Sequence, residues 1–143
     1  MKKKCVLYKS SELYPRHVCL DAETAEEILS FTDDPKIKKK FDYIVNRILN
    51  QDFIYYDDYV KLIGYDHLAE MRIFPNGLNA RIYCKEESST DGNYYIVAAK
   101  LLPKKTSEKI DKAIDQLIKP IQKYEYEFEG IAGQNPSPPS EQN

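Results

Sequence analysis

The sequence predicts an α+β protein with an N-terminal helical hairpin, a small antiparallel sheet of three to four strands and a C-terminal helix. Two changes of pattern lead to this prediction. Apolar residues recur at steps of three and four over residues 35–49, which is typical of an amphipathic helix. They alternate with polar residues over 68–85, on both sides of Pro75-Asn76-Gly77, which is typical of two half-buried strands joined by a tight turn.

Two helices are predicted before the sheet. The first spans residues 22–31, with Asp21 as a candidate N-cap. The second begins where Asp34 precedes Pro35, because aspartate caps a helix and proline suits its first turn. Only residues 32–34 separate the two helices, so we expect an αα-hairpin. The apolar stripe of the second helix consists of Ile37, Phe41, Ile44, Val45, Ile48 and Leu49.

The alternation over 68–85 assigns side chains to the two faces of the predicted sheet. A third strand, 94–101, is apolar on both faces and is therefore expected in the middle of the sheet. One face of the hairpin should pack on the core through Met71, Ile73, Ala80, Ile82 and Cys84. The opposite face is expected to be accessible and carries Glu70, Arg72, Arg81 and Tyr83.

The remaining segments set the expected domain boundaries. Residues 1–21 read as an N-terminal segment with one short strand, and 22–129 as the folded domain. Residues 51–66 are aromatic and acidic without a clear period. The final helix should start at Thr106 or Ser107, and Pro120 should end or kink it. From 130 to 143 the chain is rich in Gly, Pro, Ser, Gln and Asn, which predicts a disordered tail.

Composition and spacing narrow the classes of function. The chain has 143 residues, 42% hydrophobic residues and a net charge of −2. No apolar run reaches the roughly 20 residues that span a bilayer, and the basic start lacks the apolar region of a signal peptide. We therefore expect a cytoplasmic protein that makes no membrane contact.

Familiar catalytic and metal-binding patterns do not appear in the sequence. Three widely spaced cysteines fit neither a zinc site nor a redox pair and are expected to be buried. The two histidines lack a second ligand at metal-binding spacing. No glycine-rich phosphate loop and no nucleophile elbow are present. The sequence thus predicts neither a metal nor a small-molecule cofactor.

What remains is a group of basic residues near the predicted sheet. Arginine forks match phosphate oxygens and lysine adds a point charge, so such a group could hold an RNA backbone. Tyr65 and Tyr83 could stack on unpaired bases. The alternative is a solvated sheet face on which Glu70 or Glu87 neutralises the arginines. The basic residues are Arg72, Arg81, Lys100, Lys104, Lys105 and Lys109.

Three short motifs, in order, resemble the RelE/ParE superfamily of toxins, and its phage-associated and host-inhibition branches in particular. Leu68-Ala69-Glu70-Met71-Arg72 is similar to the family's strand that ends in glutamate, leucine and arginine. Ala80-Arg81-Ile82-Tyr83 is similar to the strand after its hairpin. Lys104-Lys105-Thr106-Ser107-Glu108, followed by Ala113, is similar to the lead into its final helix.

This resemblance implies a RelE-like fold and the toxin component of a bacterial toxin–antitoxin system. For the RNase branch it implies ribosome-dependent cleavage of messenger RNA without metal. Arg81, Lys104 and Arg72 would then be the catalytic residues that hold and polarise the phosphate. Lys105, Tyr83, Lys100 and Lys109 would bind RNA. The implied partners are a cognate antitoxin protein, messenger RNA and the ribosome.

Two other functions stay open at this point. Glu70 stands where the most active branch has lysine, and Ile110 stands where some members have tyrosine. Together with the negative net charge, these departures favour a second function: a catalytically inactive RelE-fold module that binds another protein. A gyrase inhibitor of the ParE type is the third reading. Whether the protein is an enzyme therefore depends on how the structure arranges these residues.

Overall fold

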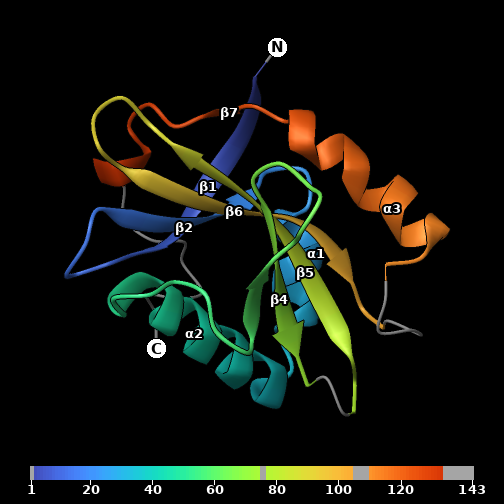
Figure 1. Ribbon diagram of the computed structural model, residues 1–143. Coiled ribbons are helices and arrows are strands. Elements are labelled where there is room, and N and C mark those ends of the chain that lie inside the picture. Colours follow the sequence, from blue (N-terminus) through green and yellow to red (C-terminus); the bar gives the residue numbers. More distant parts are fainter. Residues whose placement is uncertain (1, 75–76, 105–109, 134–143) are drawn as a thin grey trace.

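The computed structural model describes residues 2–74, 77–104 and 110–133. Its centre is a seven-stranded mixed sheet with strand order β3-β4-β5-β6-β2-β1-β7 (Figure 1). The strands are β1 (Lys3–Ser10), β2 (Arg16–Asp21), β3 (Tyr59–Lys61), β4 (Leu68–Ile73), β5 (Ala80–Ser88), β6 (Tyr94–Leu102) and β7 (Tyr126–Glu127). The helices are α1 (Ala25–Phe31), α2 (Pro35–Asn50) and α3 (Lys112–Ile118), with short 3-10 turns η1 (Lys119–Lys123) and η2 (Ile131–Gly133).

The predicted small antiparallel sheet of three to four strands is wrong. The N-terminal segment, predicted to contain one short strand, forms two neighbouring strands of the sheet, β1 and β2. β2 pairs in parallel with β6, from Arg16 opposite Tyr94 to Leu20 opposite Ala98, and β1 pairs antiparallel with β2. β3 extends the other edge beside β4, and β7 runs parallel to the start of β1. The sheet is therefore larger than expected, and it is mixed.

The central hairpin is confirmed. β4 and β5 pair antiparallel from Leu68 opposite Lys85 to Ile73 opposite Ala80. β6 lies between β5 and β2, in the middle of the sheet, as its apolar sequence predicted. Two residues of the expected turn, 75 and 76, lie outside the described residues.

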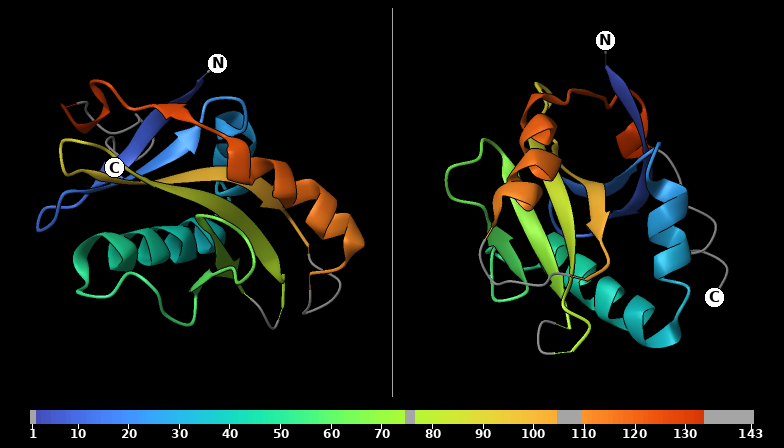
Figure 2. Two further views of the ribbon diagram at one scale, coloured as in Figure 1. Left: turned by 45° about the horizontal axis from the view of Figure 1, so that its top comes forward. Right: turned by 90° about the vertical axis from the view of Figure 1, so that its right-hand side faces the viewer.

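One face of the sheet is covered by α1 and α2 (Figure 2). The Asp34 cap is confirmed, because its carboxylate accepts hydrogen bonds from the backbone amides of Lys36 and Ile37. The cap expected at Asp21 is wrong, since α1 begins after Thr24. The main core fills the space between these helices and the sheet, and it includes Phe41, Ile44, Val45, Ile48, Met71, Ile82 and Ile96.

The opposite face of the sheet is covered by the C-terminal part of the chain (Figure 2). Ile114 and Ile118 of α3 pack with Leu68, Tyr83 and Ala99. Beside them, Tyr126 and Ile131 pack with apolar side chains of β1, β2 and β6, including the buried Cys5 and Cys19. Cys84 is buried as well, so the expectation of buried cysteines is confirmed. The predicted tail begins at Gly130, but residues 134–143 lie outside the described part of the chain.

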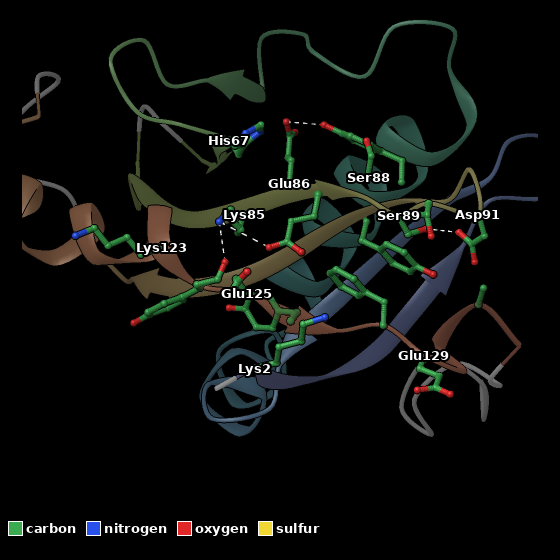
Figure 3. A pocket seen from close by; sticks show the side chains of 18 of the residues that line it. Lys2, His67, Lys85, Glu86, Ser88, Ser89, Asp91, Lys123, Glu125 and Glu129 are labelled. Atoms are coloured by element: carbon green, nitrogen blue, oxygen red, sulfur yellow. Dashed lines mark hydrogen bonds and ion pairs between the residues drawn. The ribbon is translucent and has the colours of Figure 1, made fainter.

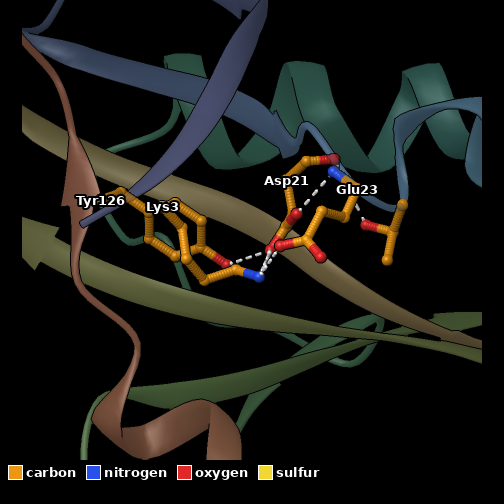
Figure 4. Close-up of polar contacts among 5 residues, drawn as sticks. Lys3, Asp21, Glu23 and Tyr126 are labelled. Atoms are coloured by element: carbon orange, nitrogen blue, oxygen red, sulfur yellow. Dashed lines mark hydrogen bonds and ion pairs between the residues drawn. The ribbon is translucent and has the colours of Figure 1, made fainter. Parts of the chain in front are cut away.

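A buried carboxylate fastens β7 to the sheet (Figure 4). The Tyr126 hydroxyl donates a 2.7 Å hydrogen bond to Asp21, which is 1% exposed. Lys3 forms an ion pair with the same carboxylate at 3.4 Å. Burial, the hydrogen bond to Asp21 and its negative charge all raise the pKa of Tyr126. The phenol therefore stays protonated and keeps donating to the carboxylate.

Replacing Tyr126 with phenylalanine should lower the free energy of unfolding by about 1 to 3 kcal/mol, because a buried charged acceptor loses its donor. Urea denaturation followed by circular dichroism measures the change. Tyr124→Phe is the matched control, since the Tyr124 hydroxyl makes no hydrogen bond to any described residue. Equal midpoints for the two variants would show that the bond to Asp21 does not hold β7.

Candidate functional site

The sheet brings four of the predicted site residues together on three neighbouring strands. Arg72 of β4 lies directly opposite Arg81 of β5. Tyr83 of β5 lies opposite Lys100 of β6, next to an irregularity in the pairing that shifts the register between Tyr83 and Cys84. Bulges of this kind re-aim side chains and often lie beside functional sites. The register therefore gathers these residues at one end of one sheet face.

Glu70 lies at the centre of this group, which we call the Glu70 cluster: Glu70, Arg72, Arg81 and Tyr83. One oxygen of Glu70, Oε2, accepts a 2.8 Å hydrogen bond from Arg72 Nε. The same oxygen lies 3.4 Å from Arg81 Nε, in an ion pair. Glu70 is also the direct cross-strand neighbour of Tyr83. A single carboxylate thus holds two guanidinium groups on adjacent strands.

The cluster is much less accessible than the alternating pattern predicted. The side chains of Glu70 and Arg81 are 2% and 6% exposed, and Tyr83 is fully buried. Arg72 differs, because its side chain is 38% exposed and opens to solvent. The expected accessible face is therefore wrong for Glu70, Arg81 and Tyr83. The physical reason is that α3 lies on this face, with Ile114 and Ile118 packed against Tyr83.

Three buried polar atoms of the cluster lack a hydrogen-bond partner within the described residues. They are Glu70 Oε1, Arg81 Nε and Tyr83 Oη. Burial raises the pKa of Tyr83, the negative charge of Glu70 raises it further, and the Arg81 guanidinium opposes the shift. The phenol is therefore a protonated donor at neutral pH. Arg81 satisfies another of its donors by a 3.2 Å bond from Nη1 to the Ala80 carbonyl.

Two of the predicted lysines, Lys100 and Lys104, lie beside the Glu70 cluster and are more exposed than its buried members. Lys100 is half-buried beside Tyr83, and Lys104 is exposed just after β6. Lys105 and Lys109, predicted to bind RNA, lie outside the described residues, as do the helix caps expected at Thr106 and Ser107. The described helix starts later, and Asp111 caps it through a 2.9 Å bond from the Ile114 amide.

The attachment of α3 to the sheet is slight. The helix has seven residues, and only Ile114 and Ile118 are buried. Its polar tether is a 2.5 Å hydrogen bond from the Tyr65 hydroxyl to Asp115. Short helices depend on tertiary packing for their stability, and segments with few buried contacts open at low free energy. α3 itself is thus held on this face by few buried side chains, and η1, which follows it directly, is fastened to β5 by Lys85.

Hydrogen exchange tests this difference in stability. We expect the backbone amides of α3 to exchange at least tenfold faster than those of β5 and β6, because opening α3 exposes little apolar surface. Mass spectrometry of peptic fragments gives both rates in one experiment. Tyr65→Phe should speed exchange in α3 and leave the strands unchanged. Equal protection of α3 and β5 would mean that the helix opens only with the whole fold.

A second polar region lies on the same side of the sheet, in a cavity of about 1130 Å³ near the end of β5 (Figure 3). Lys85 donates 2.7 Å hydrogen bonds to the carbonyls of Gln122 and Tyr124, and it lies 3.7 Å from Glu87. The two carbonyls take two of the three donors of its ammonium group, and Glu87 adds an ion pair. Lys85 therefore fastens η1 to β5.

Glu86 fastens the segment after α2 to the other face of β5. The hydroxyls of Tyr55, Tyr59 and Tyr94 all donate to its carboxylate, with the Tyr94 bond at 2.8 Å. Next to Tyr55, Phe53 is 84% exposed and borders a largely apolar hollow of about 510 Å³. The aromatic 51–66 segment, which has no clear period in the sequence, is thus attached to the sheet through Tyr55 and Tyr59. Its Phe53 side chain is exposed to solvent.

The described residues contain no group of three or more His, Cys, Asp or Glu side chains placed to hold a metal ion. Within the same residues, no helix has the length and apolar character needed to cross a bilayer. No protein-family model, curated protein or solved structure matches the chain. The resemblance to the RelE/ParE superfamily therefore stays a prediction.

The sequence did not point to Glu70 as a member of the site. From the sequence alone, Glu70 is either a partner that neutralises the arginines or a departure from the toxin motif. Its position in the alternating pattern was the available signal, because that pattern placed it on the same face as both arginines. In the structure Glu70 is the residue that orients Arg72 and Arg81.

Proposed function

We propose that this protein is the toxin component of a bacterial toxin–antitoxin system and cleaves messenger RNA on the ribosome, in the cytoplasm. One observation carries the proposal: a carboxylate, two arginines and a lysine converge on one sheet face at adjacent strand positions. A base and several cations are what cleavage of an RNA phosphodiester by its own 2′-hydroxyl requires. The chain supplies both kinds of group.

Each group has a part in this chemistry. Glu70 Oε1 accepts the proton of the 2′-hydroxyl, whose oxygen attacks the neighbouring phosphorus. Arg72 and Arg81 stabilise the negative charge that develops on the phosphate oxygens. The bond from phosphorus to the 5′ oxygen breaks, and that oxygen takes up a proton from solvent. The products are a 2′,3′-cyclic phosphate and a 5′-hydroxyl end.

The exposed cations bind the RNA outside the cluster. Arg72 and Lys104 face solvent and contact flanking phosphates, while Lys100 lies beside Tyr83 on β6. Lys105 and Lys109 add charge in the same stretch of sequence. In this scheme the buried members of the cluster become accessible when α3 opens.

A protein-binding module without catalysis is the second candidate. It is favoured by the burial of Glu70 and Arg81 behind α3, and by the exposed Phe53 beside an apolar hollow. In that case the ion pairs of Glu70 only stabilise the fold, and Phe53 contacts the partner protein. This candidate predicts complex formation without any change in RNA.

Expression in a bacterial host separates the two candidates. Induction of the wild type should arrest growth and shorten cellular transcripts within minutes, and Arg72→Ala should remove both effects because that side chain contacts phosphate. Phe53→Ala should leave the arrest unchanged. Normal growth and intact transcripts with soluble wild-type protein would refute the RNase, and arrest with intact transcripts would direct attention to gyrase supercoiling assays.

A further inference from the structure

The outer face of α2 gathers positive charge in a chain that is negative overall. Five cations lie on this face or beside it, and two carboxylates offset part of their charge, which gives a net of +3 against −2 for the whole chain. Lys9 of β1 joins the helix through a 2.6 Å hydrogen bond to Asn46. We call this group the α2 surface: Lys9, Lys38, Lys39, Lys40, Asp42, Tyr43, Arg47 and Asp58.

An exposed aromatic ring lies among these cations. Tyr43 is 50% exposed, and the Lys40 ammonium lies 5.6 Å from the centre of its ring. The exposed Lys39 lies one helical turn before Tyr43, so the two side chains are neighbours on the helix. An exposed ring beside cations is an arrangement that binds an unpaired base together with its flanking phosphates.

Arg47 is positioned to contact such a phosphate. Its guanidinium lies 3.9 Å from the centre of the Tyr56 ring, and it donates a 3.4 Å hydrogen bond to the Tyr43 hydroxyl. Stacking on a ring uses the flat face of a guanidinium, so the N–H groups at its edge can still bind phosphate oxygens. The rings thus fix Arg47 without neutralising it, whereas carboxylates neutralise Lys38 and Lys40.

The combination of ring and cations favours a nucleic acid over an acidic protein segment. Carboxylate side chains would pair with Lys39 and Arg47, but they have no flat ring to place on Tyr43. A nucleic acid supplies both groups, because every base has a face that stacks and every phosphate carries negative charge. A folded RNA with an unpaired base is therefore the partner that uses the whole α2 surface.

The α2 surface and the Glu70 cluster belong to opposite faces of the sheet (Figure 2). α2 packs on one face through Phe41 and Ile48, whereas Tyr83 of the cluster packs under α3 on the other. A helix is about 10 Å across, so a strand held at the cluster would have to pass around the edge of the sheet to reach Tyr43. The two surfaces therefore suit two different segments of RNA.

We infer that the α2 surface is a second RNA-binding site, which holds a folded RNA through an unpaired base on Tyr43 while the Glu70 cluster holds the strand to be cut. This inference rests on the proposed function only for the identity of that RNA, which on the ribosome is ribosomal RNA. Lys36 lies outside the surface, since the exposed Asp33 and Asp34 at the start of α2 oppose its charge.

Binding of an RNA hairpin tests the surface without cleavage. The probe is a fluorescent 2′-O-methyl RNA hairpin with an unpaired loop, which has no 2′-hydroxyl and so stays intact, and anisotropy gives its dissociation constant between 50 and 200 mM salt. Lys39→Glu should weaken binding about 10-fold and reduce the salt dependence, because a phosphate contact is lost. Tyr43→Ala should weaken binding about 5- to 100-fold, the effect of losing one stacked base, without reducing the salt dependence.

Lys119→Glu is the matched control for Lys39→Glu. Lys119 is also exposed and its replacement changes the charge by the same amount, but it follows α3 on the other face of the sheet. Its affinity for the hairpin should stay within about twofold of the wild-type value, since no phosphate contact is lost. All three variants should unfold at the wild-type urea concentration, because each replaced side chain is exposed.

Cleavage on the ribosome then relates the two surfaces. Lys39→Glu should raise the ribosome concentration that gives half-maximal cleavage about 10-fold and leave the maximal rate unchanged, because it removes binding and not a group that acts in the transition state. Loss of the maximal rate without a change in the half-maximal concentration would overturn the inference.

The remaining results separate the inference from the proposed function. Equal hairpin binding by the wild type, Lys39→Glu and Tyr43→Ala would overturn the inference, while cleavage of message by the wild type would keep the RNase. Hairpin binding that depends on Lys39 and Tyr43, in a protein that cuts no message, would support the inference and refute the proposed function. Tighter binding of poly-glutamate than of the hairpin would assign the surface to an acidic protein and overturn the inference.

Discussion

Replacing Glu70 with glutamine is expected to lower the free energy of unfolding by about 3 to 5 kcal/mol, because it leaves buried positive charge without its partner. Glu70 is 2% exposed and forms ion pairs with both Arg72 and Arg81. Arg81 is buried and has no other acidic partner among the described residues. Glutamine keeps the shape of the side chain, so the loss reports the charge.

Urea denaturation of the wild type and Glu70→Gln measures this loss. Glu23→Gln is the control, since Glu23 also forms an ion pair but its side chain is 74% exposed. Exposed ion pairs contribute little, so the control should unfold at the wild-type urea concentration. Equal midpoints for Glu70→Gln and the wild type would show that Arg81 is not held by a buried carboxylate.

A double variant separates this structural role from the chemistry. When Glu70 and Arg81 are both replaced by methionine, most of the lost stability should return, because two apolar side chains can replace a buried ion pair. The folded double variant should still leave RNA uncut, since it has neither the base nor the buried arginine. RNA cleavage by this variant at the wild-type rate would remove both residues from the mechanism.

Arg72→Ala is expected to reduce the rate of RNA cleavage by about 100- to 1,000-fold, the usual effect of removing one group that stabilises developing charge. The side chain is 38% exposed, so the fold should tolerate its removal far better than removal of Glu70. Rates are measured with ribosomes that carry a defined message, at equal concentrations of folded protein.

Lys36→Ala is the control for Arg72→Ala. Lys36 is exposed at the start of α2, which covers the other face of the sheet. Removing it changes the net charge by the same amount but leaves the Glu70 cluster intact. The cleavage rate of Lys36→Ala should stay within about threefold of the wild-type rate. This change is small beside the loss expected for Arg72→Ala, which removes a group that stabilises developing charge. Equal losses in both variants would point to a general charge effect.

The elements with a clear period were predictable from the sequence. The stripe from Ile37 to Leu49 gave α2, and the alternation on both sides of Gly77 gave β4 and β5. Asp34 was recognised as a cap because its interactions are local. In each of these cases the pattern depends on residues that are neighbours in the chain.

The full sheet could not be predicted in the same way. β2 lies between β1 and β6 and is covered on both faces of the sheet, so five of its six residues are buried, from His17 to Asp21. A strand covered on both faces shows no alternation, and its parallel partner β6 lies far away in the sequence. β3 and β7 are too short to show any period. The size of the sheet therefore depends on contacts that a local pattern does not contain.

The site could be predicted only in part, again because some of its contacts join residues that are distant in the sequence. Alternation placed Glu70, Arg72, Arg81 and Tyr83 on one face, and the structure brings them together there. It could not reveal that α3 covers them, because the stripe of Ile114 and Ile118 shows that a helix is buried but not where. The central role of Glu70 follows only from its distances to Arg72 and Arg81.

Mapping the ends of the cut RNA tests the central claim most directly, because the groups of the Glu70 cluster allow attack by the 2′-hydroxyl. The purified wild type is added to ribosomes that carry a defined message, and both new ends are identified. The account predicts 2′,3′-cyclic phosphate and 5′-hydroxyl ends, and no cut at a nucleotide whose sugar is 2′-deoxyribose. An intact message, or cleavage that leaves 5′-phosphate ends, would contradict it.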